Sequence, residues 1–289
     1  MENIKIIEAP VFEKRAKNAH KGTFGTALLI NGSYGMAGAA ILSARSCLRS
    51  GIGIAKMCVP DKIYQIIAAA VPEAVALPVI SSENGRFSAT DADKILNAVA
   101  GVNCIVFGCG TGQSADIAKI LDLLVKNAKC PLIIDADGIN TLSSHINIIR
   151  QAHAPVILTP HPGEMARLCG KTVAEIENDR VKTAKAFATE YNVYLVLKGS
   201  GTVVATPTGE VFINETGNPG MATGGSGDTL TGIMAALISR DSDITRAVKN
   251  SVYIHGKAGD MAAERLSETS VLPSDIIDEL PCLFKMLER

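Results

Sequence analysis

The chain has 289 residues, enough for one large hydrophobic core, and no Ser/Pro-rich or charged linker divides it. We therefore expect a single domain over residues 1–289. Its 28 Lys and Arg nearly balance its 29 Asp and Glu, so the net charge of −1 excludes the strong excess typical of proteins that bind nucleic acid or anionic membranes. Small molecules are the expected partners.

The N-terminal stretch 1–22 mixes charged with apolar residues and lacks the continuous apolar core of a signal peptide. No other run approaches the roughly 18 apolar residues of a membrane span. The seven cysteines form no CxxC pair, and most fall within apolar or helical patterns, which favours structural thiols over metal binding or disulfides. These features predict a soluble protein of the reduced cytoplasm.

Short apolar runs alternate with amphipathic stretches between residues 26 and 201. The runs, which end in glycine or an acid, cover 26–32, 103–110, 131–138, 155–164 and 193–201, and the amphipathic stretches cover 37–51, 114–128 and 179–192. Runs of Val, Ile and Leu separated by helices are typical of a mostly parallel sheet with helices on both faces. We therefore predict an α/β sandwich, in which ligands bind beyond the carboxyl ends of the strands.

The rest of the chain begins with two β-type runs and continues as helices. Residues 202–214 carry a Pro-Thr-Gly turn between the runs, which predicts an antiparallel hairpin at one edge of the sheet. Apolar residues at helical spacing follow Asp228 as far as Ile238, and 247–266 continues in the same way. We expect the first of these helices to begin at or just before Asp228.

Several familiar motifs are absent. The sequence contains no GxxxxGK(S/T), HExxH or GxSxG pattern, and its five histidines lack the spacing of metal ligands. The glycines of GSYGMAG, residues 32–38, follow a predicted strand but do not form GxGxxG, which disfavours a dinucleotide-binding Rossmann domain. The sequence assigns no separate metal site.

One carboxylate, Asp228, stands directly behind three glycines in the stretch 218–233, NPGMATGGSGDTLTGI. A helix that begins here presents unpaired N–H groups and the positive end of its dipole, and the glycines let a phosphate approach the backbone. Two interpretations are open. Asp228 is either the base that accepts a proton from a substrate hydroxyl during phosphoryl transfer, or an ordinary helix N-cap.

This stretch resembles the GxGD segment of the ribokinase-like superfamily, and with residues 218–221 in front it resembles one branch, the ADP/ATP-dependent NAD(P)H-hydrate dehydratases. The segments 21–53, 135–140, 159–168 and 198–204 match that branch in order and approximate spacing, so the resemblance spans nearly the whole chain. It implies a three-layer α/β/α sandwich with a mostly parallel central sheet, assembled as a homotetramer.

The resemblance also implies a lyase reaction. Members of the branch use ADP or ATP, with Mg²⁺, to remove water from the S epimer of NADHX and NADPHX, the hydrated forms of NADH and NADPH. Asp228 would deprotonate the C6 hydroxyl for phosphorylation, and phosphate would then leave.

Residue roles follow from the matching motifs. The implied nucleotide-binding residues are Lys198, Gly199, Ser200, Gly201, Thr202, Gly225, Gly227 and Thr229, although the first five also fit an ordinary β-turn. The implied hydrate contacts are Ala40, Gly110, Asp137, His161, Glu164 and Asp228.

Three of these assignments have alternatives. Two flanking prolines restrict the backbone at His161, which suits ligand binding, but a lone histidine is often structural. Glu164 either caps the following helix or orients the substrate. Asp135 and Asp137 follow a strand, where an acid could bind ribose hydroxyls, the substrate amide or Mg²⁺. We expect no metal shared by the two unless the chain turns between them, and we favour Asp137 as the acid that faces the ligand.

The sequence departs from the family pattern at two points. Cys109 stands where proline is usual, which predicts a less rigid loop at 108–112, GCGTG. At 289 residues the chain is too short for the epimerase domain fused to many relatives, so we expect a separate epimerase as functional partner.

Two alternative functions stay open. One is a small-molecule kinase of the same superfamily, acting on a hydroxymethylpyrimidine, pyridoxal or hydroxyethylthiazole, because its base would serve any hydroxyl. The other is a non-catalytic nucleotide sensor, in which Asp228→Asn would leave function intact. The TPHPGE segment at 159–164 and the set of glycine loops favour the dehydratase.

Overall fold

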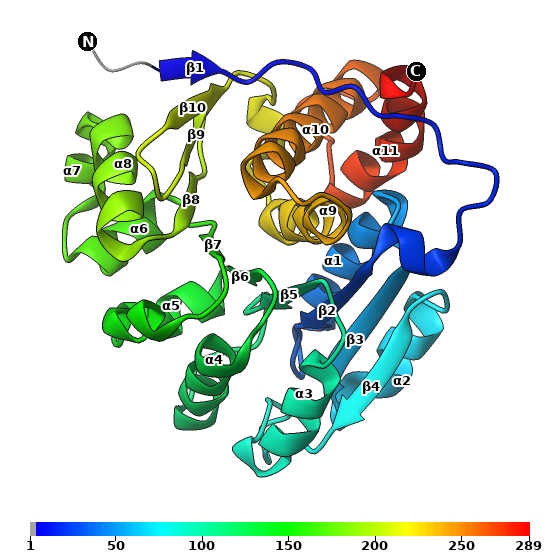
Figure 1. Cartoon of the computed structure of the whole chain (residues 1–289), viewed down its shortest axis with the longest axis vertical. Coiled ribbons are helices and arrows are strands. Elements are labelled where there is room, and N and C mark those ends of the chain that lie inside the picture. Colours follow the sequence, from blue (N-terminus) through cyan, green and yellow to red (C-terminus); the bar gives the residue numbers. More distant parts are fainter. Residues whose placement is uncertain (1–3) are drawn as a thin grey trace.

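The computed structural model describes residues 4–289 and is built around one ten-stranded sheet (Figure 1). The strands are β1 Ile4–Ile6, β2 Thr26–Ile30, β3 Ile54–Pro60, β4 Val75–Val79, β5 Cys104–Phe107, β6 Leu132–Ile134, β7 Val156–Leu158, β8 Tyr194–Leu197, β9 Thr202–Ala205 and β10 Val211–Asn214. Their order across the sheet is β1-β10-β9-β8-β7-β6-β5-β2-β3-β4.

Helices connect most of the strands. The α-helices are α1 Ala37–Arg49, α2 Asp61–Ala70, α3 Ala92–Val99, α4 Ala115–Asn127, α5 Asp137–Ser143, α6 Pro162–Cys169, α7 Val173–Asn178, α8 Arg180–Tyr191, α9 Ser226–Arg240, α10 Ile244–Arg265 and α11 Pro273–Leu287. Short 3-10 helices lie at Lys21–Phe24, Ala89–Asp91, Ile146–Gln151 and Pro219–Met221. The helices predicted at 37–51, 114–128, 179–192 and from Asp228 are confirmed to within a few residues.

The sheet is mostly parallel, as predicted. Only β9 runs antiparallel to its neighbours, β8 and β10, so the predicted β9–β10 hairpin is confirmed. The hairpin lies one strand in from the edge, because β1 pairs in parallel with β10 and forms the outermost strand. Its three residues are all exposed, and its partner lies about two hundred residues later in the chain, so this strand could not be predicted from the sequence.

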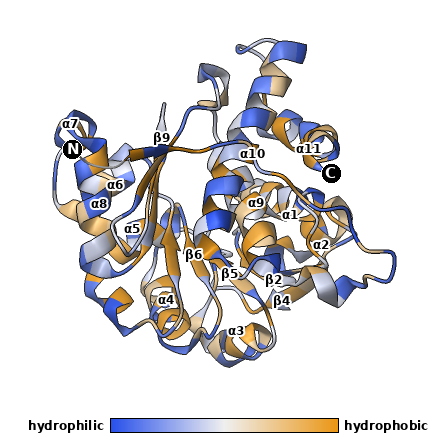
Figure 2. Ribbon diagram, turned by 45° about the horizontal axis from the view of Figure 1, so that its top comes forward, coloured by the Kyte–Doolittle hydropathy of each residue, from blue (hydrophilic) through white to orange (hydrophobic). Residues whose placement is uncertain are grey.

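The two faces of the sheet bury separate hydrophobic clusters, because successive side chains of a strand point to opposite faces. In β2, Ala27 and Leu29 join the cluster beneath α1, α2, α9, α10 and α11. Leu28 and Ile30 join the cluster beneath α3, α4, α5, α6 and α8. The predicted α/β/α sandwich is therefore confirmed. Figure 2 shows the apolar strands between helices whose outer faces are hydrophilic.

Helix α9 lies deepest among the helices, since its residues 229–239 are all buried. It packs against α1 at Gly232, where a Cβ would overlap the Ser43 carbonyl and the Ser46 hydroxyl. Such close contact between the two backbones fixes the position of α9 and directs its N-terminus toward the carboxyl ends of the central strands.

Two further expectations concern membranes and thiols. Among the helices of residues 4–289, none is long and apolar enough to cross a membrane. All seven cysteines are free thiols, and Cys47, Cys58, Cys104 and Cys109 are buried. Most of the cysteines therefore lie in the core, as the apolar patterns around them indicate.

Candidate active site

The N-terminus of α9 forms one wall of a polar site. The helix begins at Ser226, and its N-cap is Gly225, whose φ of +98° lies in the left-handed region that favours glycine. Among residues 4–289, no side-chain capping hydrogen bond forms at this N-cap. The interpretation of Asp228 as the N-cap is therefore wrong, because Asp228 lies in the first turn and leaves the helix end open to a ligand. The N–H groups of that turn and the helix dipole favour an anion there.

Asp228 is a largely buried acid. Burial, followed by the nearby carboxylate of Asp135, raises the pKa of its carboxyl to about 6, against the opposing effects of Cys109 and Lys198. A carboxyl group with a pKa near neutrality is suited to accept and release a proton. The geometry is therefore compatible with a general base at the open end of α9.

Lys198, at the end of β8, faces this acid from the other side of the site. Its Nζ lies 2.8 Å from Oδ1 of Asp135 and 3.9 Å from Oε2 of Glu164. Although burial alone would lower the pKa of Lys198, the two carboxylates raise it. A Cβ placed on Gly227 would lie 3.2 Å from this ammonium group, so Gly227 lets the cation reach the helix end.

The turn that carries Lys198 is held by Arg180, the first residue of α8. The Arg180 guanidinium donates to the carbonyl groups of Leu197, at 3.0 Å, and Lys198, at 3.1 Å, and also to that of Ser200. A Cβ on Gly199, whose φ is +143°, would lie 2.7 Å from Arg180 Nη2. Arg180 was not predicted as a site residue, because it lies in an ordinary amphipathic helix.

His161 and Glu164 form a capping box at the start of α6. Nδ1 of His161 accepts from the N–H of Gly163 at 3.0 Å, and Oε2 of Glu164 accepts from the N–H of His161 at 2.8 Å. Of the two roles considered for Glu164, capping is confirmed. Burial raises the pKa of Glu164 to about 7. The imidazole of His161 is half exposed at the site, so its role toward a ligand stays a prediction.

The chain turns between Asp135 and Asp137, which is the condition under which the two acids could share a metal. Strand β6 ends at Ile134, Ala136 has a φ of +49°, and α5 begins at Asp137. Asp137 accepts from the N–H of Gly112 at 2.8 Å and so fixes the GCGTG loop. Asp135, which the sequence left without a role, lies at the centre of the site.

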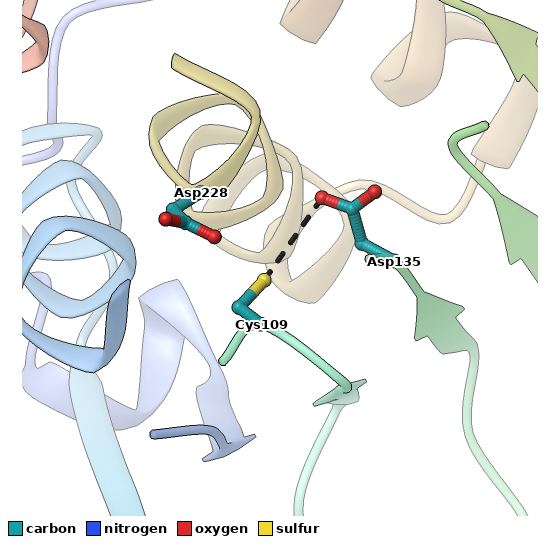
Figure 3. Close-up of side chains that lie close together, drawn as sticks. All are labelled: Cys109, Asp135 and Asp228. Carbon is teal, nitrogen blue, oxygen red and sulfur yellow. Dashed lines mark hydrogen bonds between the residues drawn. The ribbon is translucent and has the colours of Figure 1, made fainter. Parts of the chain in front are cut away.

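Cys109 and Gly110 occupy the loop after β5. The N–H of Cys109 donates to Oδ1 of Asn31 at 3.2 Å, a bond that proline would lack. Its Sγ lies 3.3 Å from Oγ1 of Thr231 and 3.9 Å from Oδ2 of Asp135 (Figure 3). Burial raises the pKa of this thiol well above its usual value. Gly110, with a φ of +66°, packs against α1, where its Cβ would lie 2.9 Å from that of Ala39.

Two of the expected site residues lie beneath the site surface. Ala40 is fully buried behind the loop at 32–38. Thr229 is also fully buried, and its hydroxyl donates to the Gly225 carbonyl at 3.2 Å. The structure does not bring these side chains to the surface on which Asp228, Lys198, Glu164 and His161 meet.

A further residue that the sequence reading missed is His255 of α10. Its Nε2 lies 3.3 Å from Oγ of Ser226, in the first turn of α9. Burial, followed by the positive charge of Lys198, lowers the pKa of His255 to about 4, so the imidazole is neutral. It comes from a helix nearly thirty residues away, and only the folded chain brings it to the site.

The chain is similar to known proteins over nearly its whole length. The bifunctional NAD(P)H-hydrate repair enzyme of Moorella thermoacetica is 38% identical over 276 residues, which cover 96% of this chain and 52% of that protein. The ADP-dependent (S)-NAD(P)H-hydrate dehydratase of Bacillus subtilis is 35% identical over 277 residues, which cover 95% of this chain and 94% of that protein. This chain thus spans about half of the first relative and nearly all of the second.

The fold and the family comparison agree. A crystal structure of the ADP/ATP-dependent NAD(P)H-hydrate dehydratase from Bacillus subtilis, co-crystallised with ATP and Mg²⁺, matches with a TM-score of 0.86 at 32% identity and covers 99% of both chains. Residues 27–282 match the family described as NAD(P)H-hydrate dehydratase. The chain therefore belongs to the NAD(P)H-hydrate dehydratase family.

Proposed function

We propose that this chain is a lyase that dehydrates the S epimer of NADHX and NADPHX to NADH and NADPH, with ADP or ATP as co-substrate. The observation that carries the proposal is Asp228, a largely buried acid with a pKa of about 6 at the uncapped N-terminus of α9. The names of the Bacillus subtilis relatives, which state this activity and its nucleotide dependence, support it.

The terminal phosphates of the nucleotide bind at the start of α9. The backbone N–H groups near Gly225 and Gly227 and the ammonium group of Lys198 stabilise their charge. The turn 199–202, held by Arg180, contacts the rest of the nucleotide.

The hydrate lies next to Asp228. Ala40 supports the loop behind it, and its other contacts are Gly110, Asp137, His161 and Glu164.

The reaction proceeds in two steps. Asp228 accepts the proton of the C6 hydroxyl as its oxygen bonds to the terminal phosphorus, and the bond from that phosphorus to the nucleotide breaks, leaving AMP from ADP or ADP from ATP. The lone pair of the adjacent ring nitrogen then expels phosphate from C6, and the resulting iminium loses a proton from C5 to solvent water, which forms the C5–C6 double bond and returns the electron pair to nitrogen. Phosphorylation is needed because hydroxide is a poor leaving group.

Mg²⁺ is proposed as the metal that accompanies the nucleotide. The carboxylates of Asp135, Asp137 and Asp228 are oxygen donors of the class that Mg²⁺ prefers, so the donor set fits an ion held jointly by one or two of them and the phosphates. Such an ion supplies neutralisation of phosphate charge.

The remaining parts of the proposal concern the setting of the reaction. We propose that residues 1–289 act as one catalytic domain in a cytoplasmic homotetramer, with no nucleic-acid or membrane partner. A separate epimerase would convert the other epimer of the hydrate.

A near-ultraviolet assay tests the proposal. Purified protein, Mg²⁺ and NADHX receive ADP or ATP, and the return of NADH absorbance is followed. Asp228→Asn should abolish recovery, while Asp122→Asn, which alters a surface acid paired with Lys126 on α4, should not. Recovery that survives Asp228→Asn would overturn the role of the base, and no recovery by folded wild-type protein with either nucleotide would overturn the function.

A further inference from the structure

Three potential metal ligands converge in the site from three separate elements. Cys109 lies in the loop after β5, Asp135 follows β6, and Asp228 lies in the first turn of α9. One ligand atom from each lies within 4.8 Å of the other two. Figure 3 shows the thiol between the two carboxylates, with its sulfur directed toward Asp135. Cys109 and Asp135 are fully or almost fully buried, so this is no solvated acidic surface.

The separation of Cys109 and Asp135 suits a small divalent ion after minor side-chain rotation, and the ligand atom of Asp228 lies within 4.8 Å of the other two. Two ligands of a tetrahedral Zn²⁺, one sulfur and one oxygen, lie about 3.5 Å apart, given bond lengths of about 2.3 and 2.0 Å. Sγ of Cys109 lies 3.9 Å from Oδ2 of Asp135. A shift of a few tenths of an ångström would place both atoms on one ion.

The two oxygens of Asp135 have different partners. Oδ1 accepts from Lys198 at 2.8 Å, whereas Oδ2 is the atom that faces Cys109. The Lys198 ion pair therefore leaves Oδ2 available and fixes its direction, as outer partners do for metal-binding carboxylates. The single positive charge of Lys198 faces two acids, Asp135 and Asp228. A bound divalent cation would offset the negative charge that the lysine leaves uncompensated.

We propose that Cys109, Asp135 and Asp228 bind a thiophilic divalent cation of the Zn²⁺ and Cd²⁺ class, and that this ion inhibits the enzyme by occupying Asp228. On binding, the Cys109 S–H bond breaks, its proton passes to the buffer, and the sulfur forms a bond to the metal. Mg²⁺ does not substitute, because thiolate is a soft ligand that favours Zn²⁺ and Cd²⁺ over hard ions. The inhibition rests on the proposed function, whereas the binding does not.

Cd²⁺ titration of the full chain, followed by the ultraviolet cadmium–thiolate absorption band, tests binding without any assay of activity. Wild type and Cys282→Ser, which removes an exposed thiol far along the chain, should show the same saturable band at one ion per chain. Cys109→Ser should lose it. Asp228→Asn should keep a thiolate band but weaken Cd²⁺ binding by about tenfold or more, as loss of a site partner does. Equal bands in wild type and Cys109→Ser, or unchanged affinity in Asp228→Asn, would overturn the site.

Zn²⁺ inhibition of the dehydratase assay tests the consequence. Zn²⁺ should inhibit wild type in the presence of excess Mg²⁺, a chelator should restore the rate, and Cys109→Ser, compared with its own metal-free rate, should need about tenfold more Zn²⁺. Equal Zn²⁺ sensitivity of the two proteins would overturn the inhibitory role. If metal-free wild type shows no dehydration at all, the proposed function fails while the Cd²⁺ titration still decides the metal site.

Discussion

Lys198 Nζ and Asp135 Oδ1 lie 2.8 Å apart and join the ends of β8 and β6 beneath the open end of α9. The side chain of Asp135 is only 2% exposed, so it depends on this partner for its charge. The same ammonium group lies next to Gly227, where we propose that phosphate binds. One lysine thus both stabilises the buried acid and completes the anion site.

Lys198→Met should lower both the stability of the protein and its affinity for the nucleotide. Removing the cation leaves Asp135 buried and unpaired, which should lower the free energy of unfolding by roughly 2–4 kcal/mol, moderated by partial solvent access to the lysine. The KM for ADP should rise by about tenfold or more, because a charge-assisted contact to phosphate is lost. Urea denaturation and steady-state kinetics measure the two effects.

The double variant Lys198→Met/Asp135→Asn provides the control for this pair. It should recover part of the lost stability, since no unpaired charge remains, but none of the nucleotide affinity. Strictly additive losses of stability in the double variant would show that the two side chains are not coupled.

Gly232→Ala tests the contact that positions α9. The added methyl group would overlap the Ser43 carbonyl and the Ser46 hydroxyl of α1, so we expect a loss of about 1–3 kcal/mol in the free energy of unfolding. Gly38→Ala is the matched control, because no atom lies within 4 Å of its added Cβ and α1 gains a better helix former, worth up to about 1 kcal/mol. Thermal denaturation distinguishes the two, and equal stability of both variants would contradict the close packing.

The sequence predicts the layers of this fold and the start of α9 because both depend on local patterns. Apolar runs separated by amphipathic stretches specify parallel strands and covering helices, and the glycines before Asp228 mark a helix end that no side chain caps. Strand β1 cannot be predicted in this way. Its three residues are too few to show a distinctive pattern, and its pairing with β10 joins parts of the chain that are far apart in sequence.

The site is predicted less completely than the fold. The sequence favoured Asp137 over Asp135, whereas the left-handed backbone at Ala136 turns the chain between them and Asp135 pairs with Lys198. Arg180 and His255 reach the site from helices whose sequences are ordinary. Residues that contact the site from distant parts of the chain have no recognisable pattern in the sequence around them, so only the structure identifies them.

The activity should depend on pH through Asp228. A general base must be ionised, and burial together with Asp135 raises the pKa of this carboxyl to about 6. The value of kcat/KM should therefore rise with pH, about tenfold per unit below that pKa, and level off above it. Because Glu164 also titrates near neutrality, the profile should be measured in wild type and in Glu164→Gln. A flat wild-type profile from pH 4.5 to 7 would contradict Asp228 as the base.

Glu164→Gln should alter how stability depends on pH. Burial raises the pKa of Glu164 from its usual 4.5 to about 7 in the folded protein, so the folded state holds the proton more tightly than the unfolded state. The stability that this protonated carboxyl contributes is complete below the unfolded pKa and is lost as the pH rises through the folded pKa.

Glutamine keeps an oxygen that accepts from the N–H of His161, as Glu164 does at 2.8 Å, and does not titrate. The free energy of unfolding of Glu164→Gln, relative to wild type, should therefore increase between about pH 4.5 and 7 by up to about 3 kcal/mol, and then stay constant. Urea denaturation of both proteins across this range measures the difference, and a difference that does not change with pH would show that Glu164 has the same pKa in the folded and the unfolded protein.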